Sequence, residues 1–443
     1  MDTAAVERFR ELLRIPTVSH SVLTASDARH LGRFRETLQR LYPRLHAELE
    51  HELVGEHAML YRWSGHASEA PLVLMAHYDV VPVVPGEWKH SPFEAVLTGE
   101  GTEATIHARG AIDDKGSLVA ILEAVESLVA DGWRPARDVY LAFGHDEEVA
   151  GLGAPAIVEV LRERGVGPAV VLDEGGAVVS GAVPGVDVET AMIGVAERGV
   201  MTLDLIAREG GGHASTPPQL PATARLARAI DRLHRRPAPV RLVPPVRAMF
   251  RTLAPFAREP FRSVFSHLAL TGALLVRMLP RFGAETNALV RTTAVVTELS
   301  GAEGENVLAT TARAAVNIRL LTGDSVAAAT ERVRRAVADP DIEIAVRHGS
   351  DPSPVSPWRG EGWRRIATAI GSALGEDVVA TPYLQLGASD SRWFTAICEN
   401  VYRFAPFRLT TSEREALHAH DERIRVDVWL RGIDFYRDLL RLS

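Results

Sequence analysis

The sequence predicts an α/β protein with a mostly parallel sheet flanked by helices, and with an α+β domain inserted into the chain. Through residues 1–195, continuous apolar runs alternate with segments whose apolar residues recur at helical spacing. That alternation is typical of parallel strands joined by crossover helices. Near residue 196 the pattern changes to half-exposed strands, and after residue 350 the first pattern returns. We therefore expect a discontinuous domain, 1–195 and 351–443, around an insert, 196–350.

The elements of the first domain follow from the length and spacing of its apolar runs. A continuous apolar run after a proline, such as "LVLMAHYDV", suits a strand that is buried on both faces. Apolar residues at helical spacing that stop at a glycine, as in "GSLVAILEAVESLVADG", indicate a helix. On these criteria we predict strands at 71–80, 137–143 and 168–173, and helices at 29–43, 116–132, 154–165 and 426–442. Sites in such sheets form at the carboxyl ends of the strands.

The insert shows the order strand, helix, two strands, helix, strand. The corresponding segments are 201–208, 221–235, 289–301, 312–321, 325–339 and 342–349. This order is that of the ferredoxin-like unit. Residues 236–288, which are rich in proline, phenylalanine and leucine, extend the insert beyond that minimal core.

Composition and charge narrow the class of protein. The 443 residues carry a formal net charge of −8, so we expect no nucleic-acid partner. The single cysteine, Cys398, excludes a disulfide within the chain. No apolar run reaches transmembrane length, and residues 1–19 lack the apolar core of a signal peptide. We therefore expect a cytoplasmic protein with no transmembrane segment.

Acidic residues and histidines follow several of the predicted strands directly. They form five groups: His77 with Asp79, Asp113 with Asp114, Glu147 with Glu148, Asp173 with Glu174, and His418 with His420. Any one of these groups could occur by chance in a solvent-exposed turn. Chance does not explain why several of them directly follow predicted strands. Converging carboxylates need a divalent cation, and carboxylate with imidazole suits Zn²⁺, with Co²⁺ or Mn²⁺ as substitutes. The supply of ligands exceeds one zinc site, so we expect two metal ions bridged by one carboxylate.

Nine motifs occur in the order that a known family shows: "AHYDVVPV", "WKHSPFEA", "ARGAIDDKGS", "HDEEVAGLGA", "LDEGG", "GGHASTPP", "LGASDSRWF", "VYRFAP" and "LHAHDERI". Through them the chain resembles the dinuclear zinc aminoacylase and carboxypeptidase family over nearly its whole length. Within that family it is most similar to the carboxypeptidase S and N-fatty-acyl-amino-acid hydrolase branches. The resemblance implies a zinc-peptidase-like fold in which the insert is a lid and dimerisation domain, and hence a possible homodimer.

The resemblance also implies a role for each acid and histidine. It implies five metal ligands, two on each zinc and one shared: His77 and Asp173, Glu148 and His418, and Asp113 as the bridge. Glu174 is the competing choice to Asp173, because relatives differ in where that acid lies. Glu147 is implied as the general base toward a metal-bridging water, and Asp79 as the carboxylate that orients His77.

Substrate contacts are implied mainly in the insert. His213 in "GGHAS" corresponds to a histidine that reaches the substrate carbonyl, commonly in the partner's active site. Arg319 and Asn306 correspond to contacts with the substrate carboxylate and backbone, although "NVLAT" departs from the family's pattern after the asparagine. Arg392 is a second candidate for the carboxylate, because a guanidinium can hold it through two hydrogen bonds.

The implied reaction is hydrolysis of the amide bond of N-acyl amino acids or small peptides with a free carboxylate. One alternative is a dipeptidase or carboxypeptidase acting on Gly-X-like peptides. A second is a binding protein that has lost the metal, against which the presence of every ligand and of the base argues.

Three interpretations of residues 236–288 remain open. The segment lines an acyl-chain groove or an apolar pocket, it packs the lid or a subunit interface, or it contacts a membrane surface. Its repeated prolines argue against the last.

Overall fold

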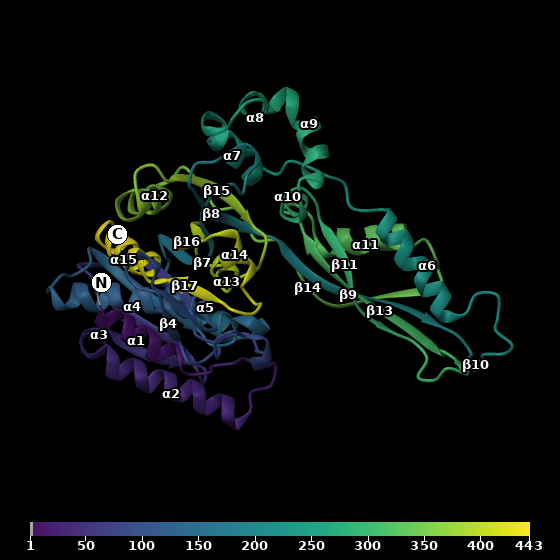
Figure 1. Ribbon diagram of the computed structural model, residues 1–443, viewed down its shortest axis with the longest axis horizontal. Coiled ribbons are helices and arrows are strands. Elements are labelled where there is room, and N and C mark those ends of the chain that lie inside the picture. Colours follow the sequence, from purple (N-terminus) through teal and green to yellow (C-terminus); the bar gives the residue numbers. More distant parts are fainter. Residues whose placement is uncertain (1–2) are drawn as a thin grey trace.

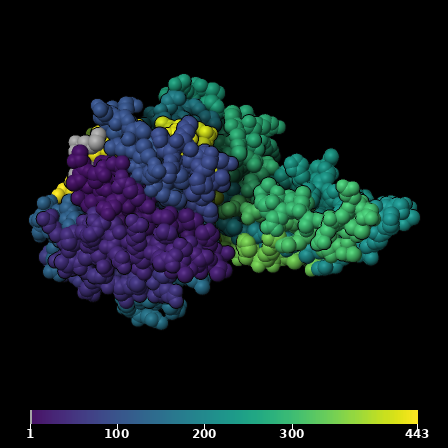
Figure 2. Space-filling view, turned by 60° about the horizontal axis from the view of Figure 1, so that its bottom comes forward, coloured from purple at the N-terminus to yellow at the C-terminus, as the bar shows by residue number. Residues whose placement is uncertain are grey.

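The computed structural model describes residues 3–443 and contains two main sheets, each with its own helices (Figure 1). The larger sheet has eight strands in the order β1-β2-β6-β3-β7-β16-β8-β15. Their bounds are β1 Glu50–Val54, β2 Ala58–Trp63, β3 Ala67–His77, β6 Arg137–Gly144, β7 Val170–Val179, β8 Thr190–Glu197, β15 Val379–Gln385 and β16 Val401–Arg408. The part of the molecule built on the smaller sheet projects from the larger one as a narrower arm (Figure 2).

The centre of the large sheet is parallel, as predicted. β6, β3, β7 and β16 run in one direction, whereas β2 and β8 pair with their inner neighbours in antiparallel fashion. Along β3, Leu72 and Leu74 belong to one apolar core, and Val73 and Met75 belong to a second core on the opposite face. Both faces are therefore buried, which explains why the strand reads as a continuous apolar run.

Helices cover both faces of this sheet. The larger core includes side chains of α1 (Thr3–Leu13), α2 (Ala25–Leu41), α4 (Lys115–Ala130), α12 (Glu361–Leu374) and α15 (Val426–Arg441). The second core includes side chains of α5 (Gly153–Glu163) and α13 (Ser391–Phe394). The predicted α/β fold is confirmed, and the carboxyl ends of β3, β6 and β7 meet at one edge of the sheet.

The smaller sheet has four strands in the order β11-β13-β9-β14, all antiparallel. Its elements are β9 Gly199–Arg208, α6 Ala222–Arg235, β11 Thr293–Ser300, β13 Thr311–Leu320, α11 Val326–Val337 and β14 Ile342–Ser350. In this order the first and third strands are central, as in the ferredoxin-like unit. The sheet and the two helices share an apolar core that is separate from that of the large sheet.

The proline-rich segment belongs elsewhere than we expected from the sequence. It forms α7 (Pro244–Leu253), α8 (Phe261–Ser266), α9 (Leu268–Met278) and α10 (Ala284–Ala288). Val246, Met249 and Phe250 of α7 join the core of the large sheet, and α7 packs on β15. Many apolar residues of 236–288 therefore pack in the core of the first domain, whereas we expected the segment to extend the insert. Among residues 3–443 no helix is both long and apolar enough to cross a bilayer.

Candidate active site

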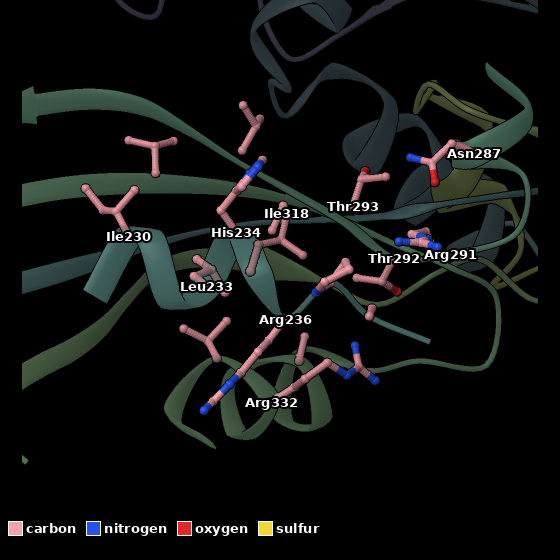
Figure 3. Close-up of a pocket in the computed structure, with 17 residues that line it drawn as sticks. Ile230, Leu233, His234, Arg236, Asn287, Arg291, Thr292, Thr293, Ile318 and Arg332 are labelled. Atoms are coloured by element: carbon pink, nitrogen blue, oxygen red, sulfur yellow. The ribbon is translucent and has the colours of Figure 1, made fainter. Parts of the chain in front are cut away.

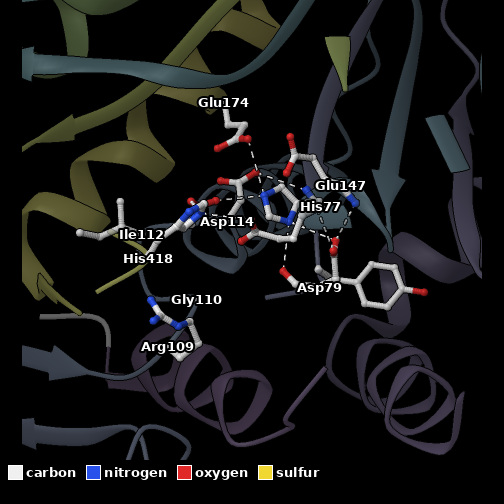
Figure 4. Close-up of polar contacts among 12 residues, drawn as sticks. His77, Asp79, Arg109, Gly110, Ile112, Asp114, Glu147, Glu174 and His418 are labelled. Carbon is white, nitrogen blue, oxygen red and sulfur yellow. Dashed lines mark hydrogen bonds and ion pairs between the residues drawn. The ribbon is translucent and has the colours of Figure 1, made fainter. Parts of the chain in front are cut away.

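His77, the last residue of β3, lies at the centre of the acidic cluster (Figure 4). Its Nε2 lies 3.0 Å from Oδ1 of Asp113 and 3.6 Å from Oε1 of Glu174. Its Nδ1 lies 3.2 Å from Oδ1 of Asp79 and 3.0 Å from the Asp79 carbonyl oxygen. A carboxylate on the far side of a metal-binding imidazole fixes which nitrogen faces the metal, so this arrangement suits a ligand held by Asp79.

His418 approaches the same cluster from the C-terminal region. Its Nε2 lies 2.9 Å from Oδ2 of Asp113 and 3.1 Å from Oε2 of Glu148. Asp113 therefore faces one histidine with each carboxylate oxygen. That is the position a carboxylate needs in order to bridge two ions.

Two overlapping groups of side chains could each hold a cation: His77 with Asp113 and Glu148, and His77 with Asp114 and Glu174. Within each group the ligand atoms lie within 4.8 Å of one another. Among the described residues, Oε1 of Glu148 and Oδ1 of Asp114 are buried without a hydrogen-bond partner. Buried carboxylate oxygens are costly to leave unpaired, so the donor set fits a divalent cation.

The charges of the cluster support the same conclusion. Burial, together with the charge of Asp113, raises the pKa of Glu174 to about 8. Burial also raises the pKa of Asp114 and of Glu147 well above their ordinary values, with the charge of Glu174 adding to both shifts. Hydrogen bonds with Asp113 and Glu148 raise the pKa of His418 to about 10. The cluster therefore has more negative charge than its histidines neutralise, and a cation would supply the rest.

Of the two neighbouring acids on β7, Glu174 rather than Asp173 faces His77. Asp173 is buried, and its Oδ2 accepts a hydrogen bond of 2.9 Å from the backbone amide of Ser391. Consecutive residues of a strand point to opposite faces, so only one of the pair can reach the cluster. The geometry favours Glu174 as the ligand and departs from our expectation of Asp173.

The three acids of "HDEEVAG" have different surroundings. Glu147 and Glu148 begin a 3₁₀ turn, and their backbone amides donate to Oδ1 and Oδ2 of Asp79 at 3.3 and 3.1 Å. Asp79 therefore positions both His77 and this turn. The side chain of Glu148 faces His418, whereas that of Glu147 forms no ion pair with a histidine of the described residues and lies near Glu174 (Figure 4).

Asp146 has a structural role in the same turn. Its carboxylate accepts hydrogen bonds from the backbone amides of Leu152 and Gly153, at the start of α5. A Cβ atom on Gly151 would lie 1.9 Å from Oδ2 of Asp146, so only glycine fits beside the carboxylate. Asp146 thus satisfies amides at a helix start, the role of a capping residue.

Arg109 and Glu422 form a buried ion pair that connects the loops of Asp113 and His418. The sequence analysis did not predict this pair. Glu422 accepts hydrogen bonds from Nη1 of Arg109 at 2.7 Å and from the backbone amides of Gly110, Ile112 and Asp113. Nη2 of Arg109 donates to the carbonyl oxygen of Ala419. The only signal in the sequence is an acid four residues after His418, inside the motif "LHAHDERI".

The same network explains the backbone at His418. Its φ is 56°, a left-handed conformation that a residue with a side chain adopts only where its surroundings impose it. Arg109 holds the carbonyl of the next residue, and β17 (Arg423–Arg425) pairs with β5 (Thr105–His107) on either side of the two loops. Glu422 and Arg109 are therefore positioning residues for the two ligands.

A second buried pair supports the cluster from the side of β8 and β16. Nε of Arg403 donates to Oε1 of Glu197 at 2.6 Å, and both side chains are fully buried. Glu197 also accepts hydrogen bonds from the hydroxyls of Ser389 and Ser391. Since the Ser391 amide donates to Asp173, this network links the end of β8 to β7. An arginine inside the apolar run "VYRFAP" was its only sequence signal.

Three arginines lie where the two sheets join. Arg392 of α13 donates to the Ser350 hydroxyl of β14, and Arg198, between β8 and β9, donates to the carbonyl oxygen of Arg319 on β13. Burial, with the charge of Arg392, lowers the pKa of Arg319, and burial with the charge of Arg319 lowers the pKa of Arg198 to about 10. Arginines that repel one another would be stabilised by an anion. Arg198 was not among the residues predicted.

His213 and Asn306 lie together, but far from the cluster. His213 belongs to β10 (Gly212–His213), which pairs with β12 (Val307–Leu308), and the Ala214 amide donates to the carbonyl oxygen of Asn306. Figure 1 shows β10 at the far tip of the smaller sheet. Within one chain, neither residue belongs to the site around His77.

A separate apolar pocket of about 530 Å³ lies between α6, α11 and β11 (Figure 3). Ile230, Leu233, Ile318 and Val333 form much of its wall. Among the described residues that line it there is no aspartate or glutamate, so it cannot hold the catalytic metal.

The role of Glu422 can be tested through metal binding. Replacing Glu422→Gln would leave Arg109 buried without a counter-charge and would weaken the acceptor for three amides. We expect metal affinity to fall about 10- to 100-fold, as for other groups that orient metal ligands. Chelator competition measures this, and activity should recover at high metal concentration. The control is Glu87→Gln, which removes an exposed acid paired with His420. Unchanged affinity in the Glu422 variant would contradict a positioning role.

Comparison with known proteins gives the family. The model of Peptidase family M20/M25/M40 matches residues 73–442. The N-fatty-acyl-amino acid synthase/hydrolase PM20D1 of Xenopus tropicalis is 34% identical over 99% of this chain and 85% of its own length. The probable carboxypeptidase S-like 2 of Dictyostelium discoideum is 32% identical over 92% of this chain and 79% of its own.

The solved structures agree on the fold. The M20 family metallo-carboxypeptidase Sso-CP2 from Sulfolobus solfataricus superposes with a TM-score of 0.72 at 19% identity, covering 100% of this chain and 99% of that one. The acid and histidine cluster, the family match and the fold lead to one conclusion. The chain belongs to Peptidase family M20/M25/M40 and is a metal-dependent enzyme that acts on amide bonds.

Proposed function

We propose that the protein is a dinuclear zinc hydrolase that cleaves the amide bond of N-acyl amino acids or small peptides with a free carboxylate. The observation that carries the proposal is Asp113, whose two oxygens face His77 and His418. One cation would be held by His77, Asp113 and Glu174, and the other by Asp113, Glu148 and His418. When bound, the pair would supply positive charge that polarises the scissile carbonyl and activates water.

Glu147 is the proposed general base. It lies close enough to the ligands to feel the charges of His77 and Glu148, and among the described residues no hydrogen bond or ion pair joins its carboxylate to either histidine. Its carboxylate can therefore accept a proton from the attacking water. It then returns the proton to the nitrogen of the departing amine. Asp79 supports this role, because it holds the Glu147 amide and His77 together.

The arginines at the junction of the sheets are the proposed site for the substrate carboxylate. Burial and the nearby charge of Arg392 lower the pKa of Arg319. Nε of Arg198 is buried without a hydrogen-bond partner among the described residues. A carboxylate would neutralise this group through bidentate hydrogen bonds. His213 and Asn306 would then act on substrate only in the site of a second copy, through a homodimer formed by the smaller domain.

The similarity to a named N-fatty-acyl-amino acid synthase/hydrolase favours N-acyl amino acids as substrates. The similarity to a named carboxypeptidase S-like protein favours peptides as the second candidate. The acyl-groove interpretation of residues 236–288 is weakened, because the inward side chains of α7 and α9 pack into the core.

A substrate panel with metal counted on the same sample tests the proposal. We expect two equivalents of zinc, chelator-sensitive activity, and higher kcat/KM for N-acyl amino acids than for dipeptides of the same C-terminal residue. Preference for Gly-X dipeptides would select the carboxypeptidase alternative. Well under one equivalent of metal, with no chelator-sensitive hydrolysis, would instead indicate a binding protein.

Removing the proposed base should separate chemistry from metal binding. Glu147→Gln keeps the size of the side chain but cannot accept the proton, so kcat should fall by about 10²- to 10⁴-fold. Metal content should stay at the wild-type value by elemental analysis. Near-wild-type turnover in this variant would show that another group is the base.

The choice between the two acids of β7 is tested by paired variants. Glu174→Ala should lower zinc content and activity together, because it removes a ligand. Asp173→Asn keeps an acceptor for the Ser391 amide, so zinc content should change little. The opposite pattern of zinc content would restore Asp173 as the ligand.

A further inference from the structure

The outer face of α9 is apolar and has no partner within the chain. Leu270, Leu274 and Met278 are spaced four residues apart, so they share one side of the helix. Their exposed fractions are 84%, 62% and 42%. Leu268, Gly272, Leu275 and Val276 on the opposite side are buried and hold the helix against the fold. The outer residues are therefore not needed for packing.

Two arginines share this face. Arg277 follows Leu270 by seven residues within α9, so it lies near the same side, and Arg281 lies in the 3₁₀ turn η5 (Leu279–Arg281) that follows α9 directly. Their guanidinium groups donate only to the carbonyl oxygens of Ala273 and Arg277, and no ion pair joins either to an acid within residues 3–443. With Arg291, Val240 and Pro280 they line a hollow of about 540 Å³ that contains no acidic side chain among the described residues.

The surrounding segment is basic in an acidic protein. Residues 236–288 contain eight arginines and two glutamates, in a chain with a net charge of −8. Glu285 pairs with Arg414, and Glu259 accepts a hydrogen bond from the Ser263 amide, so neither acid pairs with Arg277 or Arg281. Of these arginines, Arg241 and Arg258 pair with Asp324 and Asp187, whereas Arg277 and Arg281 lie beside the exposed apolar stripe without an acidic partner among the described residues.

We propose that the α9 face, made of Leu270, Leu274, Arg277, Met278 and Arg281, docks on the surface of a bilayer containing anionic phospholipid. An exposed apolar stripe bordered by arginine suits the boundary between acyl chains and head groups. The arginine-lined hollow complements the phosphate of an anionic lipid. α8 and α9 project from the rest of the fold, so a flat surface can reach them (Figure 1).

The charge pattern disfavours the other obvious occupant, a second copy of this chain. A symmetric contact through the α9 face would place the same residues of both copies against each other. The arginines of both copies would then share one interface to which the α9 face contributes no acid, and this is unfavourable. An anionic lipid surface satisfies both the apolar stripe and the arginines.

Vesicle flotation of the full-length protein tests the proposal, with phosphatidylcholine vesicles compared with vesicles that also contain phosphatidylglycerol. We expect binding to the anionic vesicles that weakens as salt is raised. The variant Arg277→Gln with Arg281→Gln should lose about fivefold in partition for each arginine removed. The variant Leu270→Asp with Leu274→Asp should lose binding to the anionic vesicles, because it removes the apolar contact.

A matched control places the same kinds of change on α2 and the loop before it. Val22→Asp with Arg29→Gln alters an exposed apolar residue and an exposed arginine there, and should bind like the wild type. Thermal unfolding checks that each variant is folded. The proposal is overturned if the wild type does not float with anionic vesicles, or if the control loses as much binding as the α9 variants. A change in oligomeric state of the leucine variant would assign the face to a contact between copies instead.

Discussion

Repulsion among the buried carboxylates around His77 is the constraint on which the rest of the site depends. Asp113 and Asp114 come from the loop before α4 and Glu174 comes from β7, yet all three lie within a few ångströms of one imidazole. Burial makes this proximity more costly, because little solvent screens the charges. The raised pKa values of Asp114 and Glu174 express that cost. A fold that keeps these groups together must either add cations or protonate the acids, and the family membership selects cations.

The buried acids of this protein fall into two kinds. Glu197 and Glu422 are fully buried, and each has an arginine and further donors that satisfy its oxygens. Glu148 and Asp114 are also enclosed, but each retains a carboxylate oxygen without a partner among the described residues. A buried charge with full pairing maintains the shape of its surroundings, whereas an unpaired one marks a place where a ligand belongs. The paired acids therefore hold the loops that carry the unpaired ones.

The two sheets divide the proposed substrate contacts between them. Arg319 comes from the smaller sheet and Arg392 from α13 in the larger domain, and the Ser350 hydroxyl joins Arg392 to the smaller sheet. In the proposed function, a substrate carboxylate at this junction would link the two domains. His213 and Asn306, at the far tip, would contribute only across a subunit boundary. Catalysis would then depend on assembly as well as on the chain's own site.

The sequence by itself determined the fold class and the positions of the site. The period of the apolar residues in 71–80 and 116–132 is a local property, and so is the appearance of acids at the ends of strands. These patterns, with the family motifs, were enough to predict the α/β sheet and to select His77, Asp113, Glu148 and His418, which the structure brings together.

Only the tertiary structure decided which acid of a pair faces the cluster and which partner each distant residue has. Asp173 and Glu174 are equivalent in composition, and the orientation of β7 alone turns Glu174 toward His77. Arg109 and Glu422 are 313 residues apart, and Arg403 and Glu197 are 206 apart, so no local pattern could pair them. The sequence likewise could not predict that residues 236–288 pack on the large sheet. Apolar residues indicate that a segment is buried, but they do not indicate which part of the protein it packs against.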